Sequence, residues 1–258
     1  MDYILFSIEN NVARITFNRP EVYNSMHQAM RQEILDALDV CAQDPQVRAV
    51  YLTGTGKAFC AGEDLQEIVD PNGPSLTTII STGYNPMVLK IRNLDKPVVC
   101  AVNGVAAGAG ANIALACDIT VATASASFTQ AFSKIGLIPD SGGTWTLPRL
   151  VGLQRAAALM MLSDKISAAD AAAMGMIWKV YADETFVADS LKLAETLAQM
   201  PTRGLALTKM ALNQAFSNDF AAQLAVEDAY QSAAGQTHDY QEGVAAFLEK
   251  RKPVFKGE

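Results

Sequence analysis

Two stretches rich in small residues follow apolar runs and could bring backbone N–H groups close to a ligand. The first, GVAAGAGAN at 104–112, follows the uncharged run 98–102 and leads into a helical pattern. The first N–H groups of a helix have no intrahelical acceptor, and small residues let a ligand approach them. This arrangement favours stabilisation of an oxyanion. Close packing of a helix on a sheet is the alternative, and alone it explains the small residues better.

The same stretch does not fit the glycine motifs of nucleotide-binding loops. A dinucleotide fingerprint requires G-x-G-x-x-G, and after Gly108 and Gly110 the third position falls on Ile113. A P-loop would need Gly-Lys-Ser/Thr four residues after a glycine, and the chain has none. Nucleotide binding of these two kinds is therefore excluded as the leading interpretation.

The second stretch is FCAGEDL at 59–65, which comes just after a predicted strand. It also places small residues where the chain leaves the core. One such loop is common, but two loops that each follow a buried strand could direct paired N–H donors at a single oxygen.

Asp140 is the most interesting side chain, because it lies in a loop of apolar residues and glycines. Leu137, Ile138 and Trp145 are close to it in the sequence. In an apolar pocket its pKa would rise, which suits a carboxyl group to proton transfer. An exposed turn or a helix N-cap is the alternative interpretation. Ser141 is an unlikely nucleophile, since the nucleophile elbow requires glycine two positions before the serine.

Alternating and helical patterns predict the elements that position these loops. Strands are predicted at 13–17, 47–53, 98–102 and 119–122, and residues 66–83 read as a loop or mobile segment. After residue 153 helical patterns dominate, at about 153–162, 168–174, 185–199, 203–216, 219–234 and 240–250. A helix over about 28–41 separates the first two strands. The layout is an α/β core followed by an all-helical region.

Composition narrows the classes of protein. The 258 residues are 50% hydrophobic and 18% charged, with a net charge of −7, which disfavours non-specific nucleic-acid binding. Four cysteines and two histidines offer neither a disulfide framework nor a His-rich metal centre. The uncharged stretch 98–117 reads better as strand, turn and helix than as a membrane span. With an acid at position 2 and no basic leader pattern, the chain is expected to be cytoplasmic.

Several long motifs, in order along the whole chain, resemble the crotonase superfamily of enoyl-CoA hydratases and isomerases. They are NRPEVYNSM, FCAGEDL, KPVVCAVNGVAAGAGANIALACD, FSKIGLIPDSGGTWTLPRLVG and SAADAAAMGMIWKV. Within the family, YNPMVLKI, GLIPDSGGTW and DYQEGVAAFLEKRKPVFKG are similar to the isomerase subfamily of aerobic phenylacetate degradation. That subfamily converts 1,2-epoxyphenylacetyl-CoA to a ring-expanded oxepin.

The resemblance implies an α/β fold, a spiral of strand-strand-helix turns with a C-terminal helical region for trimerisation. The expected division is a spiral core at 1–200 with the CoA-thioester site, and helices at 201–258 for oligomerisation and CoA contacts. The backbone N–H groups of Glu63 and Ala109 would form the oxyanion hole for the thioester carbonyl. The expected ligand is an acyl-CoA thioester and the expected assembly a homotrimer or hexamer. No metal, no separate cofactor, no nucleic acid and no membrane partner is expected.

The chain departs from the hydratase pattern at both catalytic glutamates. Those positions fall on Asn112, six residues before Asp118, and on Phe132, four residues before Gly136. Isomerases of the family often carry a carboxylate just after the GLIP turn, which here is Asp140. The resemblance therefore implies isomerisation with Asp140 as acid and base.

The remaining expected contacts concern the substrate. Phe132, Leu137 and Trp145 could form an apolar acyl pocket that Tyr84 closes, with core packing as the alternative. Lys250 and Arg251 could meet CoA phosphates, with solvated surface charge as the alternative. The predicted substrate-binding residues are Val22, Asn24, Ala61, Asp64, Leu65, Tyr84, Asn112, Phe132, Leu137, Trp145, Phe247 and Lys250.

Three other functions stay open from the sequence. A Δ3,Δ2-enoyl-CoA isomerase would use the same base and the same oxyanion hole. A hydratase would have to rely on Asp140 alone. A non-catalytic CoA-thioester-binding subunit would use only the binding site.

Overall fold

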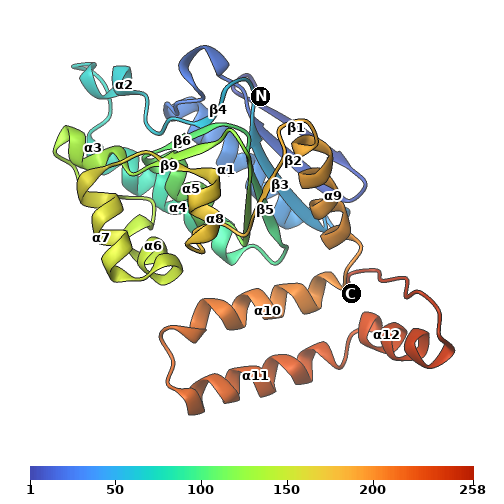
Figure 1. Ribbon diagram of the computed structural model, residues 1–258. Helices are drawn as coiled ribbons and strands as arrows, with labels where there is room; N and C mark the ends of the chain where they lie inside the picture. Colours follow the sequence, from blue (N-terminus) through green and yellow to red (C-terminus); the bar gives the residue numbers. More distant parts are fainter.

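The computed structural model describes residues 1–258, whose strands form a larger and a smaller sheet (Figure 1). The larger sheet has six strands in the order β1-β2-β3-β5-β7-β10. Only the β1–β2 pair is antiparallel, and all other neighbours are parallel. The strands are β1 (Ile4–Glu9), β2 (Val12–Phe17), β3 (Ala49–Gly54), β5 (Val98–Val102), β7 (Ile119–Thr123) and β10 (Lys179–Tyr181).

The smaller sheet repeats the order of the larger one. Its strands are β4 (Ala58–Cys60), β6 (Val105–Ala107), β8 (Ser127–Thr129) and β9 (Ile166–Ser167), in that order. The chain runs from β3 to β4, from β5 to β6 and from β7 to β8, so each pass adds one strand to each sheet at adjacent positions. Helical segments follow each pass. The expected spiral of strand-strand-helix turns is therefore confirmed.

Twelve numbered helices complete the fold, and none combines the length and the apolar composition needed to span a membrane. Two 3₁₀ turns, at Pro20–Val22 and Ala131–Ile135, and a π-helical turn at Ile79–Tyr84 accompany them. The helices are α1 (Gln28–Gln43), α2 (Leu65–Val69), α3 (Leu76–Thr78), α4 (Asn85–Asn93), α5 (Ala109–Ala116), α6 (Gly143–Val151), α7 (Leu153–Leu162), α8 (Ala168–Ala173), α9 (Phe186–Ala198), α10 (Thr202–Ala215), α11 (Phe220–Ala234) and α12 (His238–Glu249).

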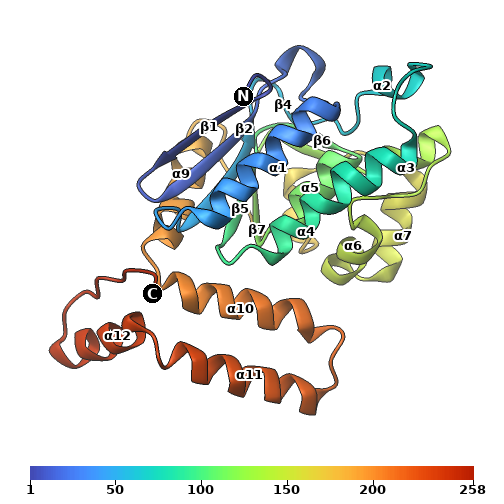
Figure 2. The ribbon, with the colours of Figure 1, turned by 180° about the vertical axis from the view of Figure 1, so that it is seen from behind.

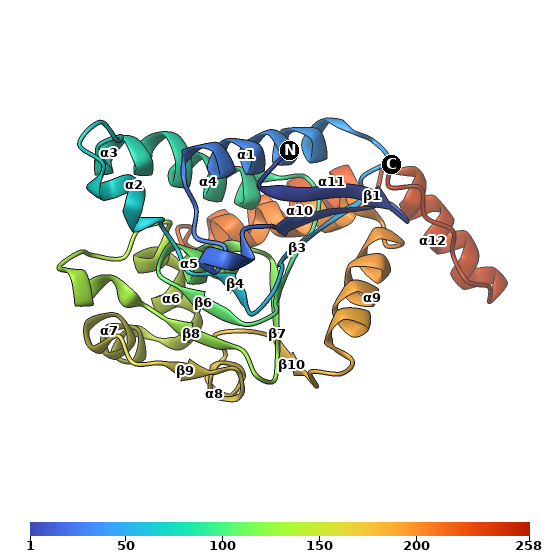
Figure 3. The same ribbon diagram turned by 90° about the horizontal axis from the view of Figure 1, so that it is seen from above.

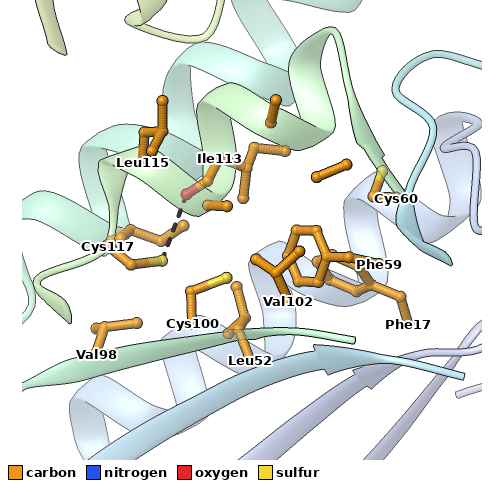
Figure 4. Close-up of a cluster of buried hydrophobic side chains, with 14 of the residues drawn as sticks. Phe17, Leu52, Phe59, Cys60, Val98, Cys100, Val102, Ile113, Leu115 and Cys117 are labelled. Carbon is orange, nitrogen blue, oxygen red and sulfur yellow. Dashed lines mark hydrogen bonds between the residues drawn. The ribbon is translucent and has the colours of Figure 1, made fainter. Parts of the chain in front are cut away.

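Alternate side chains of the larger sheet enter two separate cores. In β5, Val98, Cys100 and Val102 belong to the main core, and Val99 and Ala101 to a smaller core beneath α9. Figure 4 shows the side chains of β5 pointing toward α5, and Figure 3 shows α9 on the other side of the sheet from α1 and α4. All eight residues of α5 are buried, so its small side chains let the helix lie deep between the sheets.

The prediction of a loop at 66–83 was wrong. The segment contains α2, α3 and the π-helical turn, in which Ile79, Gly83 and Tyr84 are buried. Side chains of Asp64 and Ser75 cap the first two of these helices. The helices are too short to show a full apolar repeat, which is why the pattern did not reveal them.

The last three helices project from the spiral (Figures 1 and 2). Lys209 of α10 makes an ion pair with Asp118 at 2.8 Å and donates to the carbonyl of Ile91, which joins α10 to the core. The tail returns beside α10, where Arg48 donates to the carbonyls of Met200 and Phe255. The division at residue 200 stays a prediction, since these contacts connect the helices to the core.

Candidate active site

The two small-residue loops lie in contact at one end of the smaller sheet, because β4 and β6 are parallel neighbours. Gly62 has φ +96°, and a Cβ there would lie 3.4 Å from the backbone nitrogen of Ala109. A side chain at Gly110 would lie 2.3 Å from the carbonyl oxygen of Cys60. Glycine is therefore required at both positions, once for its backbone conformation and once for its size.

Both predicted oxyanion donors have free N–H groups. Ala109 is the first residue of α5, so its N–H has no acceptor within the helix. The N–H of Glu63 donates no hydrogen bond, although Met26 binds the backbone on either side of it, at Gly62 O and Asp64 N. Two unpaired N–H groups on touching loops, one of them at the positive end of a helix, can bind a carbonyl oxygen that gains charge.

Asp140 is half-buried and contacts the first turns of α5. The Asn112 Nδ2 donates to its backbone carbonyl at 2.9 Å, and Asn112 is one helical turn beyond Ala109. The Ser141 Oγ donates to the Asp140 carboxylate at 2.9 Å. Burial raises the pKa of Asp140, and the Ser141 hydrogen bond partly offsets that rise. The structure thus brings the backbone of Asp140 to the first turn of α5, where the N–H of Ala109 lies.

Asn112 holds the Asp140 loop through hydrogen bonds and has no exposed surface. Its Oδ1 accepts from Gln130 Nε2 at 2.7 Å, while its Nδ2 binds the Asp140 carbonyl. Asn112 therefore braces the Asp140 loop, and its contact with substrate stays a prediction. Sequence analysis missed Gln130, whose Oε1 is the one buried side-chain oxygen without a partner. A glutamine beside a 3₁₀ turn gives no signal of such a role.

Phe132 and Leu137 form the apolar side of this place. Phe132 is buried. A Cβ on Gly108, the residue before Ala109, would lie 3.8 Å from the ring of Phe132. The N–H of Leu137 donates to the carbonyl of Phe132 and keeps the two residues together. Both therefore remain predicted contacts of the acyl group.

Trp145 is exposed, and its predicted contact with the acyl group stays a prediction. Its ring is stacked against the Arg149 guanidinium at 4.0 Å, with that of Arg92 at 5.7 Å. With Val88 of α4 it lines a surface hollow between α4 and α6. A cation–π pair with arginine competes with burial against the acyl pocket, which the sequence alone did not reveal.

Tyr84 is buried, with 1% of its surface exposed, and does not form an open lid. Its hydroxyl donates to Glu63 Oε2 at 2.6 Å. Arg31 donates to the same carboxylate at 2.7 Å and was missed from the sequence. The available signal was a basic residue four positions before Leu35, on the buried side of α1.

The predicted contacts at 22–24 and 61–65 are of two kinds, residues that hold their loops in place and residues that are exposed. Asn24 is fully buried and donates to the carbonyls of Thr55 and Ala58, so it braces its loop and is not free for substrate. Asp64 pairs with Arg19 at 3.0 Å and caps α2. Val22 and Leu65 are exposed and Ala61 is half-exposed, so these three remain predicted contacts.

The two predicted C-terminal contacts lie on α12, apart from the site within this chain (Figure 2). Phe247 is 82% exposed, and Lys250 ends the helix in a left-handed conformation. Arg251 is held by Glu242 and Glu249. The guanidinium of Arg251 is therefore already neutralised, and the expected phosphate contact is not formed within one chain.

The spiral fold and the two unpaired N–H groups, which can bind a carbonyl oxygen, together define a class of protein. The chain belongs to the enoyl-CoA hydratase/isomerase family, whose model matches residues 7–258.

Individual relatives are similar to this chain over nearly its full length. The chain is 48% identical over 260 residues to 1,2-epoxyphenylacetyl-CoA isomerase of Escherichia coli (strain K12), covering 100% of this chain and 99% of that protein. It is 45% identical to "Probable enoyl-CoA hydratase" of Rhodobacter capsulatus, covering 98% of each. A crystal structure of an enoyl-CoA hydratase from Bacillus anthracis superimposes with a TM-score of 0.95 at 33% identity, covering 99% of this chain and 100% of that one.

Proposed function

We propose that the protein is an acyl-CoA isomerase that converts 1,2-epoxyphenylacetyl-CoA to the ring-expanded oxepin-CoA. The observation that carries the proposal is the half-buried Asp140, whose backbone is bonded to Asn112 one helical turn beyond the free N–H of Ala109. Asn112 and Phe132 stand where hydratases of the family are expected to carry glutamates, so no carboxylate pair serves water addition. The 48% identity to an isomerase of this substrate supports the same conclusion.

The chemistry follows from the geometry. The thioester carbonyl binds the two N–H groups, and negative charge that develops on its oxygen is stabilised there by about 3 kcal/mol per donor. Asp140 accepts a proton from the acyl chain or assists opening of the epoxide, and then returns the proton. Substrate and product have the same composition, so these steps consume neither water nor a cofactor. The CoA group arrives as part of the substrate.

The decisive experiment compares kcat/KM for 1,2-epoxyphenylacetyl-CoA, a 3-enoyl-CoA and crotonyl-CoA. Conversion of the epoxide with the highest efficiency, and negligible hydration of crotonyl-CoA, is the expected result. Preference for the 3-enoyl-CoA would establish the second candidate, a Δ3,Δ2-enoyl-CoA isomerase, which the same single carboxylate supports. Hydration as efficient as isomerisation would overturn the proposal. Binding of all three thioesters without turnover would identify a non-catalytic subunit.

We also infer a homo-oligomer, a trimer or a hexamer. Three exposed apolar residues at the α10–α11 turn, Leu212, Phe216 and Phe220, and two on α12, Phe247 and Leu248, would be covered by a second copy. In such an assembly Phe247 and Lys250 could reach the CoA group of a neighbouring subunit. Light scattering tests the assembly, and a monomer would contradict it. Weaker binding of CoA esters by Lys250→Ala, with a smaller salt dependence, tests the contact.

A further inference from the structure

A buried cluster of charged and polar side chains surrounds the carboxylate of Glu63. Arg31 of α1 binds both Glu63 oxygens at 2.7 Å and reaches Glu67 of α2 at 2.6 Å. Tyr84 of the π-helical turn donates its hydroxyl to the Glu63 Oε2 at 2.6 Å. Only 4% of the Arg31 side chain is exposed. Two separate elements, α1 and the π-helical turn, therefore hold one side chain of the oxyanion loop, and α2 holds Arg31.

The partners of this cluster are accounted for within the chain. Glu67 also accepts from the backbone N–H of Gln28, and the Arg31 guanidinium lies 5.5 Å from the centre of the Tyr84 ring. A side chain at Gly83 would come within 2.8 Å of the Arg31 side chain, so the π-helical turn packs directly on it. Such a complete set of bonds fixes the Glu63 side chain in one orientation.

The orientation of the Glu63 side chain bears on the peptide plane between Gly62 and Glu63. The N–H of Glu63 belongs to the peptide plane that follows Gly62, the residue with φ +96°. Glycine permits rotation of that plane more readily than any other residue. The carbonyl of Gly62 lies in this same plane and accepts from the backbone N–H of Met26 at 2.8 Å, so Met26 holds the plane from one side. The bonds of the Glu63 carboxylate to Arg31 and Tyr84 are a second restraint on the direction of this N–H, acting through the side chain.

We propose that Glu63 positions its own backbone N–H for the oxyanion through the bonds of its carboxylate to Arg31 and Tyr84. Arg31 and Tyr84 are thus positioning residues of the reaction, although neither touches the substrate. This inference rests on the proposed function only in requiring that a thioester carbonyl binds at this place.

Protonation of the cluster is expected to weaken this restraint. Burial first, and then the neighbouring Glu67, raise the pKa of Glu63 to about 7, against the opposing effects of Tyr84 and Arg31. Burial opposes a lower pKa of Glu67, but hydrogen bonds with Glu63, the backbone of Gln28 and Arg31 lower it, and burial raises the pKa of Tyr84. Cys60 is the other titratable group that faces the cluster. As the pH falls through about 7, Glu63 gains a proton and its charge no longer holds Arg31.

The test measures the direction of the N–H through a bound chromophore. The absorption of 4-(dimethylamino)cinnamoyl-CoA moves to longer wavelength when its carbonyl accepts hydrogen bonds. Tyr84→Phe removes a single bond to Glu63 and is expected to reduce this shift and to lower kcat by about tenfold with little change in KM. Tyr51→Phe is the matched control, because Tyr51 is also buried and loses one bond, to Ser190, in the core beneath α9. It should leave the shift and kcat unchanged.

Two further variants keep the test informative if Tyr84→Phe does not fold. Both Glu63→Gln and Glu63→Ala retain the backbone N–H, but only glutamine can still accept a bond from Arg31. The shift should decrease from wild type to glutamine to alanine, and only wild type should lose part of it between pH 8 and 6. A wild-type shift that Glu63→Ala leaves intact would overturn the inference. Absence of a shift in wild type would instead contradict the oxyanion hole and with it the proposed function.

Discussion

Ala109 presents its N–H from the first turn of a fully buried helix, whereas Glu63 presents its N–H from a loop restrained by polar side chains. In the first case the small residues of α5 and the contact of Gly110 with Cys60 fix the backbone. In the second, the carboxylate of Glu63 depends on Arg31 and Tyr84. The two donors would bind one oxygen, yet dense packing holds one and charged hydrogen bonds hold the other. Changes in packing should therefore affect the first donor, and changes in charge the second.

Asp140→Asn removes the carboxylate and leaves both N–H donors in place. We expect it to have the largest effect on turnover. The variant keeps the shape of the side chain but cannot accept a proton, so kcat/KM should fall by about 10²–10⁴-fold. The absorption shift of the bound chromophoric thioester should persist, because both N–H groups remain. Turnover within threefold of wild type would show that Asp140 is not the acid and base.

Gly110→Ala should disturb the N–H donor of Ala109, which the packing of α5 positions. The added Cβ would stand 2.3 Å from the carbonyl oxygen of Cys60, so α5 must move away from β4. We expect about 1–3 kcal/mol of destabilisation in urea unfolding. The displacement of Ala109 should lower kcat by roughly 10- to 100-fold.

Gly204→Ala, at a half-exposed position of helix α10, is the matched control for this change. There the nearest atom to the new Cβ, Cγ of Pro201, is at an ordinary 3.8 Å. This variant should be up to about 1 kcal/mol more stable and fully active. Equal effects of the two substitutions would contradict the role of packing at Gly110.

The same contrast explains how far the sequence could predict this site. The α5 loop has a local signature, small residues after a buried strand, and Asp140 lies in a loop of visibly apolar residues. The contacts of Glu63 come from residues 32 positions before it and 21 after it, which no local pattern connects. The arginine stacking of Trp145 and the backbone bonds of Asn24 were not foreseen for the same reason, because both depend on tertiary neighbours. The spiral itself was predictable from the order of strands together with the family resemblance.

Ser141→Ala should change the pH dependence of activity by a smaller amount. As a base, Asp140 must be ionised, so kcat/KM should rise with pH along an acid limb set by its raised pKa. The Ser141 hydrogen bond favours the ionised form, and its loss should raise the pKa further. The acid limb should therefore move to higher pH, with a loss of a few fold at any pH on that limb. Ser125→Ala, at an exposed turn, should leave the profile unchanged, and a move of the Ser141→Ala limb to lower pH would contradict the assignment.

Gln130→Met should have the smallest effect, because two opposing contributions nearly cancel. The substitution leaves the buried Asn112 Oδ1 without its donor, which costs about 1–3 kcal/mol. It also removes the unpartnered Oε1 of Gln130, whose burial costs about 1–3 kcal/mol. Stability in urea should therefore change by no more than about 1–2 kcal/mol in either direction. Asn112 keeps its bond to the Asp140 carbonyl, so kcat should fall by only a few fold. A loss as large as that of Asp140→Asn would show that Gln130 belongs to the catalytic groups and does not act only through Asn112.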